Sequence, residues 1–409
     1  MSTTATTTRP EGGLQSPRTN SLTSGQMPGW TWMVVAAGAI VLGALITLLL
    51  ADGFNVAGFL VITAVLFVIG MYVATRVLEN RRRATDGLWR HLVWLAFLIA
   101  LAPLISVLWS VIATGLPTLI SNPHLIAYDM KGVTGVADAN WVEAGMPAGD
   151  LPGGFGHALL GTVLITLIAT LISVPIGMLT SIYLVEYGRG GWFSRAIVFF
   201  VDVMTGIPSI VAGLFAYAAV SWVLTLTMGS QSKALQTVQM GFSAAIALSV
   251  LMIPVVVRST EEMLRVVPNE LREGSYALGV RKWHTIFRVV LPTAISGIAS
   301  GITLAIARVI GETAPLLLTV GMVTSVNWNM FDGRMATLPT FINQQYRNGN
   351  ANCMSDTVTN PINQEVYACA VSTNIDRAWA AAFTLIVIVM ILNIIARMIS
   401  HYFSPKLSR

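Results

Sequence analysis

Long apolar stretches, separated by short polar segments, follow one another along most of the chain. A helix needs about 20 consecutive, mostly apolar residues to cross the hydrocarbon core of a bilayer. Eight stretches meet that requirement, at residues 30–51, 57–77, 92–116, 158–183, 196–227, 241–257, 294–323 and 379–402. The pattern therefore predicts an all-α polytopic membrane protein with about eight transmembrane helices.

The composition agrees with this fold class. Only 11% of the residues are charged, whereas a soluble globular protein carries about 25%. The formal net charge of +5 does not indicate a nucleic-acid partner, because the basic residues are concentrated in particular loops. Their distribution reports the orientation of the chain in the membrane instead.

Basic residues flank the predicted spans on one side of the membrane. They are Arg76, Arg81, Arg82, Arg83 and Arg90 after the second span, Arg258, Arg265, Arg272, Arg281, Lys282 and Arg288 after the sixth, and Arg397, Lys406 and Arg409 in the tail. On the other side, residues 117–153 hold four acidic residues against Lys131 alone. Cytoplasmic loops are enriched in Lys and Arg, so both termini are expected to be cytoplasmic.

The chain divides into segments of different character. Residues 1–29 are rich in Ser, Thr, Gly and Pro, which predicts a disordered cytoplasmic tail and not a cleavable signal peptide. Residues 30–91 form an accessory two-helix segment, set apart by the run Arg81-Arg82-Arg83. Residues 92–153 supply the first core helix and an extracytoplasmic loop. Residues 154–403 hold the rest of the core.

Residues 324–377 form a second long extracytoplasmic loop in this topology, and it contains both cysteines. Thiols outside the cytoplasm tend to oxidise, so a disulfide between Cys353 and Cys369 is one expectation. Two unpaired thiols in the loop are the alternative.

A polar, basic insert, residues 258–292, separates the sixth and seventh spans. Asn269 can cap a helix whose first turn holds Glu270 and Glu273. Gly279 permits a sharp turn of the backbone. A second helical stretch follows at residues 281–290, and Pro292 opens the next span. The predicted form is helix, glycine turn, helix.

The spacing in this insert resembles the cytoplasmic coupling loop of ABC-transporter permeases. That family pattern is Glu-Ala-Ala, three residues, Gly, nine residues, then Ile-x-Leu-Pro. Here Glu273-Gly274-Ser275 precede Gly279 by the same interval, and Val289-Val290-Leu291-Pro292 follow at the expected distance. The resemblance implies that a separate ATPase subunit docks on Glu273, Gly274, Ser275, Tyr276, Ala277, Leu278, Gly279 and Lys282. A merely solvated amphipathic loop is the alternative.

The sequence contains no G-x-x-x-x-G-K-[ST] phosphate loop, so a separate nucleotide-binding subunit would have to supply ATP hydrolysis. It also contains no H-E-x-x-H motif and no interpretable Ser, His and Asp set. We therefore expect a transport subunit and not an enzyme. The chain itself would bind no cofactor and no metal, and the partner ATPase would use ATP and Mg.

Five further segments, at residues 154–162, 174–187, 207–215, 252–264 and 307–317, are similar to the A-type permease subunit of phosphate ABC transporters. This resemblance implies a six-helix type I importer core in the inner membrane, to which the two N-terminal helices are an addition. It also implies a homologous C-type permease, an ATPase dimer and an extracytoplasmic phosphate-binding protein as partners, in contact with membrane lipid. A permease for another oxyanion or small solute, or an ion-coupled secondary transporter, remains an alternative.

Two charged residues, Arg308 and Glu312, lie near the middle of the seventh predicted span. A charge there costs about 2.5–3.5 kcal/mol on insertion scales, so such residues face protein or water. Their i, i+4 spacing predicts a shared helix face, which Gly297, Gly301 and Ala305 continue. An anion path and an ion pair that fixes a partner subunit are both compatible with this pattern.

An arginine offers a planar fork of donors that suits phosphate oxygens. The family resemblance implies that Arg308 is required for phosphate movement, with Glu312 and Thr313 beside it. It adds Arg258 as a second substrate-path candidate, although an arginine at the cytoplasmic end of a span can also be a simple orientation anchor.

Overall fold

The computed structural model describes residues 27–50, 55–145, 147, 149–188, 190–351, 357–359, 364, 366–368 and 371–403. The chain forms two compact units, Met1–Leu108 and Trp109–Arg409. The boundary falls inside one long helix and not at residue 91, where the predicted accessory segment ends.

The first unit is built from three long helices. They are α1 (Thr31–Leu50), α2 (Val56–Leu78) and α3 (Arg81–Ser110), the last of which continues into the second unit. Helices α1 and α2 pack closely, because a Cβ at Gly43 would overlap the side chain of Thr63. Most of their apolar side chains are exposed, as expected for helices that face lipid.

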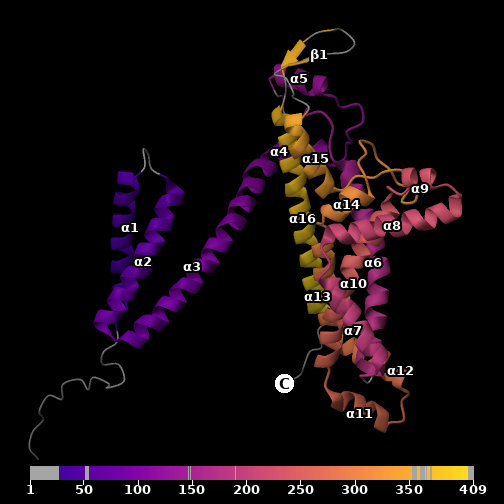
Figure 1. The fold of residues 1–409 in the computed structure, drawn as a ribbon, viewed down its shortest axis with the longest axis horizontal. Coiled ribbons are helices and arrows are strands. Elements are labelled where there is room, and N and C mark those ends of the chain that lie inside the picture. The colour runs from indigo at the N-terminus through magenta and orange to yellow at the C-terminus, as the bar shows by residue number, and fades with distance from the viewer. Residues whose placement is uncertain are drawn as a thin grey trace, which may run out of the picture. The chain divides into compact units, whose positions relative to one another are not determined.

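The second unit is a helical bundle with small additions at both ends (Figure 1). In chain order it contains η1 (Val111–Gly115), α4 (Leu116–Ser121), η2 (Pro123–Ile126), α5 (Gly135–Glu143), α6 (Gly156–Ile182), η3 (Tyr183–Tyr187), α7 (Trp192–Thr205), α8 (Ser209–Met228), α9 (Gln231–Thr237), α10 (Gly241–Val266), α11 (Asn269–Ala277), α12 (Lys282–Thr285), η4 (Ile286–Val290), α13 (Leu291–Val309), α14 (Ala314–Thr319), α15 (Leu338–Ala351), β1 (Thr357–Thr359), β2 (Val366–Ala368) and α16 (Val371–Phe403).

The centre of this bundle is α10, which packs against α6 and α13. Its buried side chains include Ala244, Leu248 and Met252, which form a core with residues of both neighbours. Small residues bring the helices together: a Cβ at Gly177 of α6 would lie 2.7 Å from Val256, and one at Gly301 of α13 would lie 2.5 Å from Ser259. Close backbone approach through small residues is how membrane helices associate without a hydrophobic driving force.

Eight helices of the described chain are long and apolar enough to cross a membrane. This confirms the predicted fold class and number of spans. The predicted extracytoplasmic loop 324–377 is more structured than expected, since it contains α15 and the antiparallel pair β1 and β2, in which Thr357 lies opposite Ala368.

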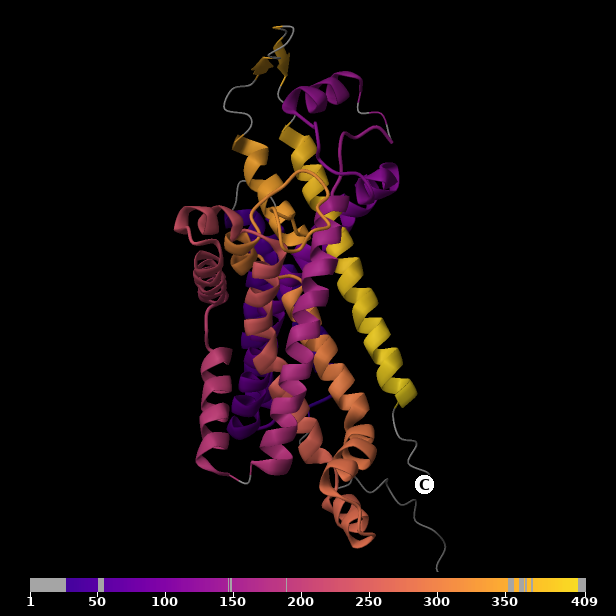
Figure 2. The ribbon, with the colours of Figure 1, turned by 90° about the vertical axis from the view of Figure 1, so that its right-hand side faces the viewer.

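The predicted fifth span, 196–227, is wrong as a single helix. It is two helices, α7 and α8, separated at Gly206–Pro208. Pro208 has φ −57° and ψ 137°, an extended conformation, and its ring removes a helical hydrogen bond. The chain turns there, and α8 runs at a large angle to α7 while it packs against α10 and α14 (Figures 1 and 2).

The predicted seventh span, 294–323, is also interrupted. Helix α13 ends at Val309, residues 310–313 are not helical, and α14 begins at Ala314. The ring of Pro315 would clash with the carbonyl of Gly311 in a continuous helix, so the chain breaks before it. At its other end the span begins earlier than predicted, because α12, η4 and α13 run without interruption from Lys282 to Val309. Pro292 therefore lies inside this continuous run and does not open it.

Candidate functional site

The insert between α10 and α13 projects beyond one end of the bundle (Figures 1 and 2). It consists of α11, a turn at Gly279, and α12, as the sequence predicts; we call residues 267–285 the coupling segment. The helix boundary differs by one residue from the prediction, since Pro268 holds the N-cap position and Asn269 is the first helical residue.

The turn at Gly279 ends α11 in a defined way. Gly279 has φ +77°, a left-handed conformation that favours glycine. Its N–H donates to the Tyr276 carbonyl at 2.9 Å, and the Val280 N–H donates to the Ser275 carbonyl at 3.2 Å. These two bonds form a Schellman motif, which satisfies the last carbonyls of α11 and fixes the angle at which the chain leaves it.

The outer surface of the coupling segment is apolar and exposed. Leu278 is 84% exposed and Trp283 is 52% exposed, with Leu271, Tyr276 and Val280 beside them. Glu273, Gly274, Ala277 and Gly279 are also exposed, so most of the predicted docking residues do lie at this surface. An open groove of about 580 Å³ runs along it, lined by Leu271, Leu278 and His284 among others. Contiguous apolar surface rimmed by polar groups is typical of protein interaction sites.

The inner surface of the coupling segment is held by polar contacts to the bundle. Ser275 and Thr285 join α11 to α12 through their hydroxyl groups, 2.9 Å apart. Arg272 Nε donates to Glu186 Oε1 at 3.0 Å, and Lys282 Nζ donates to the backbone carbonyl of Glu186. Desolvation, together with the nearby Glu186 carboxylate, raises the pKa of the Tyr276 phenol above its ordinary value.

Arg258 lies near the same end of α10 in a network of four charged residues. Its guanidinium pairs with Asp202 on α7 and, at 3.0 Å, with Glu261 Oε2. Glu261 Oε1 also accepts from Arg265 at 2.7 Å. Asp202 is 57% exposed, whereas Glu261 is only 7% exposed. Arg258 therefore has one fixed, buried partner and one exposed partner.

Arg308 lies in the last turn of α13 and is exposed. In the part of the chain that the structure describes, no ion pair or hydrogen bond of its side chain is found. The predicted helix face shared with Glu312 is wrong, because the helix ends at Val309 and Glu312 follows in the break. Thr313, the N-cap residue of α14, is half-buried beside it.

The small residues of α13 are packed against α10, whereas Arg308, seven residues beyond Gly301 and on nearly the same side of the helix, is exposed. Gly297 and Gly301 pack against Met263 and Ser259 of α10, and Ala305 is fully buried. Arg308 instead continues the exposed positions Ser300 and Leu304.

The two arginines lie at different depths along the bundle. Gly301 contacts Ser259, the neighbour of Arg258, and Arg308 is seven residues further along α13. At about 1.5 Å per residue, Arg308 is about 10 Å nearer the opposite end of the bundle. The two arginines therefore do not form one site. They lie at different positions along the length of the bundle.

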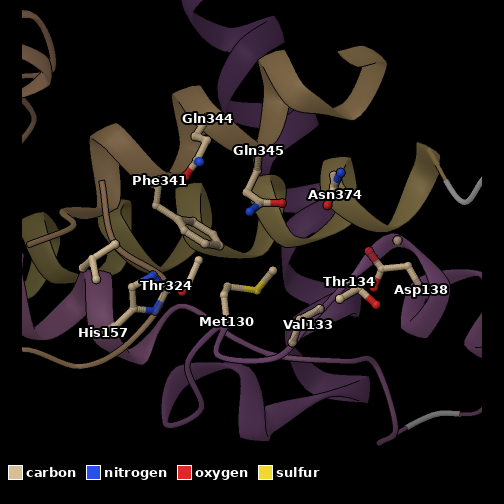
Figure 3. A pocket seen from close by; sticks show the side chains of 12 residues that line it. Met130, Val133, Thr134, Asp138, His157, Thr324, Phe341, Gln344, Gln345 and Asn374 are labelled. Carbon is tan, nitrogen blue, oxygen red and sulfur yellow. The ribbon is translucent and has the colours of Figure 1, made fainter. Parts of the chain in front are cut away.

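A partly open pocket of about 140 Å³ lies at the other end of the bundle, and Figure 3 shows the side chains that line it. Buried side-chain atoms without a hydrogen-bond partner in the described structure line it, namely His157 Nδ1 and Gln345 Oε1. The charged group on its wall, Asp138, is paired with the fully buried Arg377. The lining therefore offers no unpaired cation from the described residues, and it suits ordered water better than an anion.

The predicted disulfide cannot be placed, because Cys353 and Cys369 lie outside the described residues. The pairing stays a prediction, which a mass shift on reduction and alkylation would test.

The family model of binding-protein-dependent transport system inner membrane components matches residues 173–409. This match covers α10, the coupling segment and α13. The chain belongs to this family. It is thus a multi-pass inner-membrane protein of the permease type, in agreement with its eight apolar helices.

Several relatives of this family member carry more specific names. A "Phosphate transport system permease protein PstA 1" of Mycobacterium tuberculosis is 42% identical over 80% of this chain and 92% of its own length. A PstA of Mycobacterium leprae is 42% identical over 79% and 90%, and one of Haemophilus influenzae is 33% identical over 78% and 94%. A chain of the MetNI methionine ABC transporter, solved in inward-facing conformations, is 17% identical, with a TM-score of 0.42 over 61% of this chain and 93% of that one.

Proposed function

We propose that this chain is the permease subunit of an ATP-driven, binding-protein-dependent importer that moves inorganic phosphate across the cytoplasmic membrane. The observation that carries the proposal is the coupling segment of a permease-family member, which projects from the bundle and exposes apolar side chains such as Leu278 and Trp283. The names of the relatives support phosphate as the substrate.

The partners follow from this function. Two ATPase subunits, which bind ATP and Mg, dock under the coupling segment and its counterpart on a homologous C-type permease. A phosphate-binding protein delivers the ion from outside. The apolar side chains of the segment fit a groove on the ATPase, and the Gly279 turn sets the angle between its two limbs. This chain then performs no bond chemistry of its own.

Both termini are cytoplasmic in this proposal. The basic residues of the coupling segment mark its end of the bundle as cytoplasmic. Helix α16 runs from the end that carries β1 and β2 toward the end that carries α11, which supports a cytoplasmic C-terminus (Figure 2).

The phosphate path runs along the exposed face of α13 that carries Ser300, Leu304 and Arg308, opposite the second permease. Arg308 supplies the donors for the anion, and the break at Glu312 and Thr313 supplies polar groups next to it. Arg258 acts further along the path, nearer the end of the bundle that carries the coupling segment. Its charge is already balanced by Asp202 and Glu261, so an anion that reaches it is held weakly and can leave.

Transport by the reconstituted complex tests the proposal. The chain is purified with its permease and ATPase partners, placed in vesicles with the binding protein, and supplied with labelled phosphate. We expect that uptake of the labelled phosphate requires ATP. Excess unlabelled phosphate should inhibit this uptake, whereas sulfate and molybdate should not. Inhibition by another oxyanion would assign that substrate instead, and uptake driven by an ion gradient without ATP would indicate a secondary transporter.

Arg308→Ala tests the path. Charge-assisted hydrogen bonds contribute about 1.5–3 kcal/mol each, so uptake is expected to fall about 10- to 100-fold with assembly intact. Arg308→Lys keeps the charge but loses the planar fork, and should retain intermediate uptake. Arg195→Ala, at an exposed arginine of α7, is the matched control. Normal uptake by Arg308→Ala would return Arg308 to a structural role.

A further inference from the structure

The coupling segment is attached to a helix that is not its neighbour in sequence. Glu186, in η3 at the end of α6, receives hydrogen bonds from Arg272 on α11 and from Lys282, the first residue of α12. These residues are 86 and 96 positions away from Glu186. Both limbs of the segment thus contact the same point of α6.

The Arg272 guanidinium connects three elements at once. Its Nε donates to Glu186 Oε1 at 3.0 Å, its Nη2 to the Leu264 carbonyl at 2.8 Å, and its Nη1 to the Val267 carbonyl at 2.6 Å. The two carbonyls lie at the end of α10, where a helix has no intrahelical partners for them. The arginine therefore completes the end of α10 while it joins α11 to α6.

The site is buried and has several contacts. The Glu186 side chain is 6% exposed and that of Arg272 is 12% exposed. The Lys282 ammonium lies 4.7 Å from the centre of the Tyr187 ring, a cation–π contact. Glu186 and Tyr187 both belong to η3, a π-helical turn, and such turns reorient side chains and are frequent at functional sites.

We propose that Glu186, Arg272 and Lys282 form a positioning joint through which movement of the coupling segment is transmitted to α6. The inference rests on the proposed function, but it goes beyond docking, because it names the element that is moved. Helix α6 is about 40 Å long at 1.5 Å per residue, and it is stiff enough to carry a displacement along its length. Its far end holds the extracytoplasmic connection, where Thr162 Oγ1 accepts from the Leu338 N–H at 2.7 Å.

Two conservative variants test the joint in the reconstituted complex. Glu186→Gln keeps the shape and removes the charge, and Arg272→Lys keeps the charge but loses the fork that reaches three elements. We expect ATP hydrolysis to continue in both, while phosphate moved per ATP falls about tenfold, a loss typical of coupling between distant sites. The matched controls are Glu262→Gln and Arg195→Lys, at exposed residues of α10 and α7.

Cysteine labelling on α6 and α13 distinguishes a loss of transmitted movement from general damage to the protein. Single cysteines are placed at Val163 of α6 or Leu304 of α13, both exposed, in a chain whose Cys353 and Cys369 are replaced by serine. In the wild-type background, ATP should change the labelling rate at both positions. In Glu186→Gln the change should disappear at Val163 and persist at Leu304. A persistent change at Val163, or its loss at both positions, would overturn the proposal.

Failure of this inference differs from failure of the proposed function. If the wild-type complex moves phosphate with ATP and both variants equal it, only the joint is refuted. If the wild-type complex shows neither uptake nor ATP-dependent labelling, the proposed function itself fails. Copurification of the ATPase with each variant shows that a loss of coupling is not a loss of assembly, and Arg272→Lys decides the matter if Glu186→Gln does not assemble.

Discussion

Gly279 shows how a single residue shapes the proposed docking surface. Its φ of +77° is unfavourable for any side chain and most unfavourable for a β-branched one, although a Cβ would meet no neighbouring atom there. The constraint is therefore on the backbone and not on packing. A substitution at this position changes the direction of the chain after α11, which is the property that docking needs.

Gly279→Val should reduce phosphate moved per ATP while the bundle stays folded. The strain of such a position is about 1–3 kcal/mol, and the turn relieves it by rearranging. Uptake and ATP hydrolysis are measured side by side in the reconstituted complex. Gly229→Val is the matched control, because Gly229 also has a left-handed φ, +64°, and open space around it, but ends α8. Equal coupling in the two variants would argue against docking at the Gly279 turn.

At the scale of elements, the contact between α6 and the loop before α15 is unusually close. A Cβ added at Gly161 would overlap the carbonyl oxygen of Ala336, a backbone atom that cannot move aside by itself. Ala336 belongs to a buried core with Phe155, Leu338 and Phe341, and Gly161 is buried as well. The close approach of α6 to the loop before α15 therefore depends on glycine at this position.

Gly161→Ala is expected to destabilise the second unit by about 1–3 kcal/mol, the usual cost of overpacking. Gly274→Ala, in the helix α11 with no atom within 4 Å of the new Cβ, should be neutral or slightly stabilising. Thermal unfolding of the two purified variants in the same detergent checks the difference. A Gly161→Ala melting temperature equal to that of Gly274→Ala would show that the loop is free to shift.

The elements differ in how far the sequence alone determines them. Apolar length is sufficient to predict that a helix exists, and all eight predicted spans have a counterpart among the described residues. It does not show a break, because membrane helices tolerate proline where neighbours satisfy the backbone. The breaks at Gly206–Pro208 and at residues 310–313 were thus predicted as continuous helix, and the shared face of Arg308 and Glu312 was wrong for the same reason.

The candidate site also has parts that the sequence predicts and parts that it does not. The glycine turn was predictable because its signal is local, a fixed spacing from Glu273 to Gly279. The contacts of Glu186 with Arg272 and Lys282 were not, because a single sequence carries no signal for side chains that are 86 and 96 residues apart. The π-helical turn that presents Glu186 has no pattern of its own in the apolar run.

At the scale of the whole molecule, the features proposed for transport are concentrated in one unit. The unit Trp109–Arg409 contains the coupling segment, Arg258 and Arg308, and the close-packed helices α6, α10 and α13. The helices α1 and α2 contribute no residue to any of these sites. The described residues of α1 and α2 thus lie outside every site proposed for transport.

Deletion of residues 1–79 should leave ATP-dependent phosphate uptake within about twofold of the full-length chain, since changes at independent sites have small effects on each other. The deletion retains the whole of α3, which begins at Arg81. Uptake per assembled complex is compared for the two chains in the same vesicles. Abolished uptake in an assembled complex would give the two helices a direct part in transport.

Within the described residues, π-helical turns occur at Val111–Gly115, Tyr183–Tyr187 and Ile286–Val290. Each such turn accommodates one residue more than an α-helix would, so everything beyond it is rotated by about 100° relative to a regular helix. The turn at Ile286–Val290 lies between the coupling segment and the rest of α13. Deletion of one residue there would rotate Trp283 and Leu278 toward another side of the bundle. The apolar surface proposed to contact the ATPase would then face in a different direction.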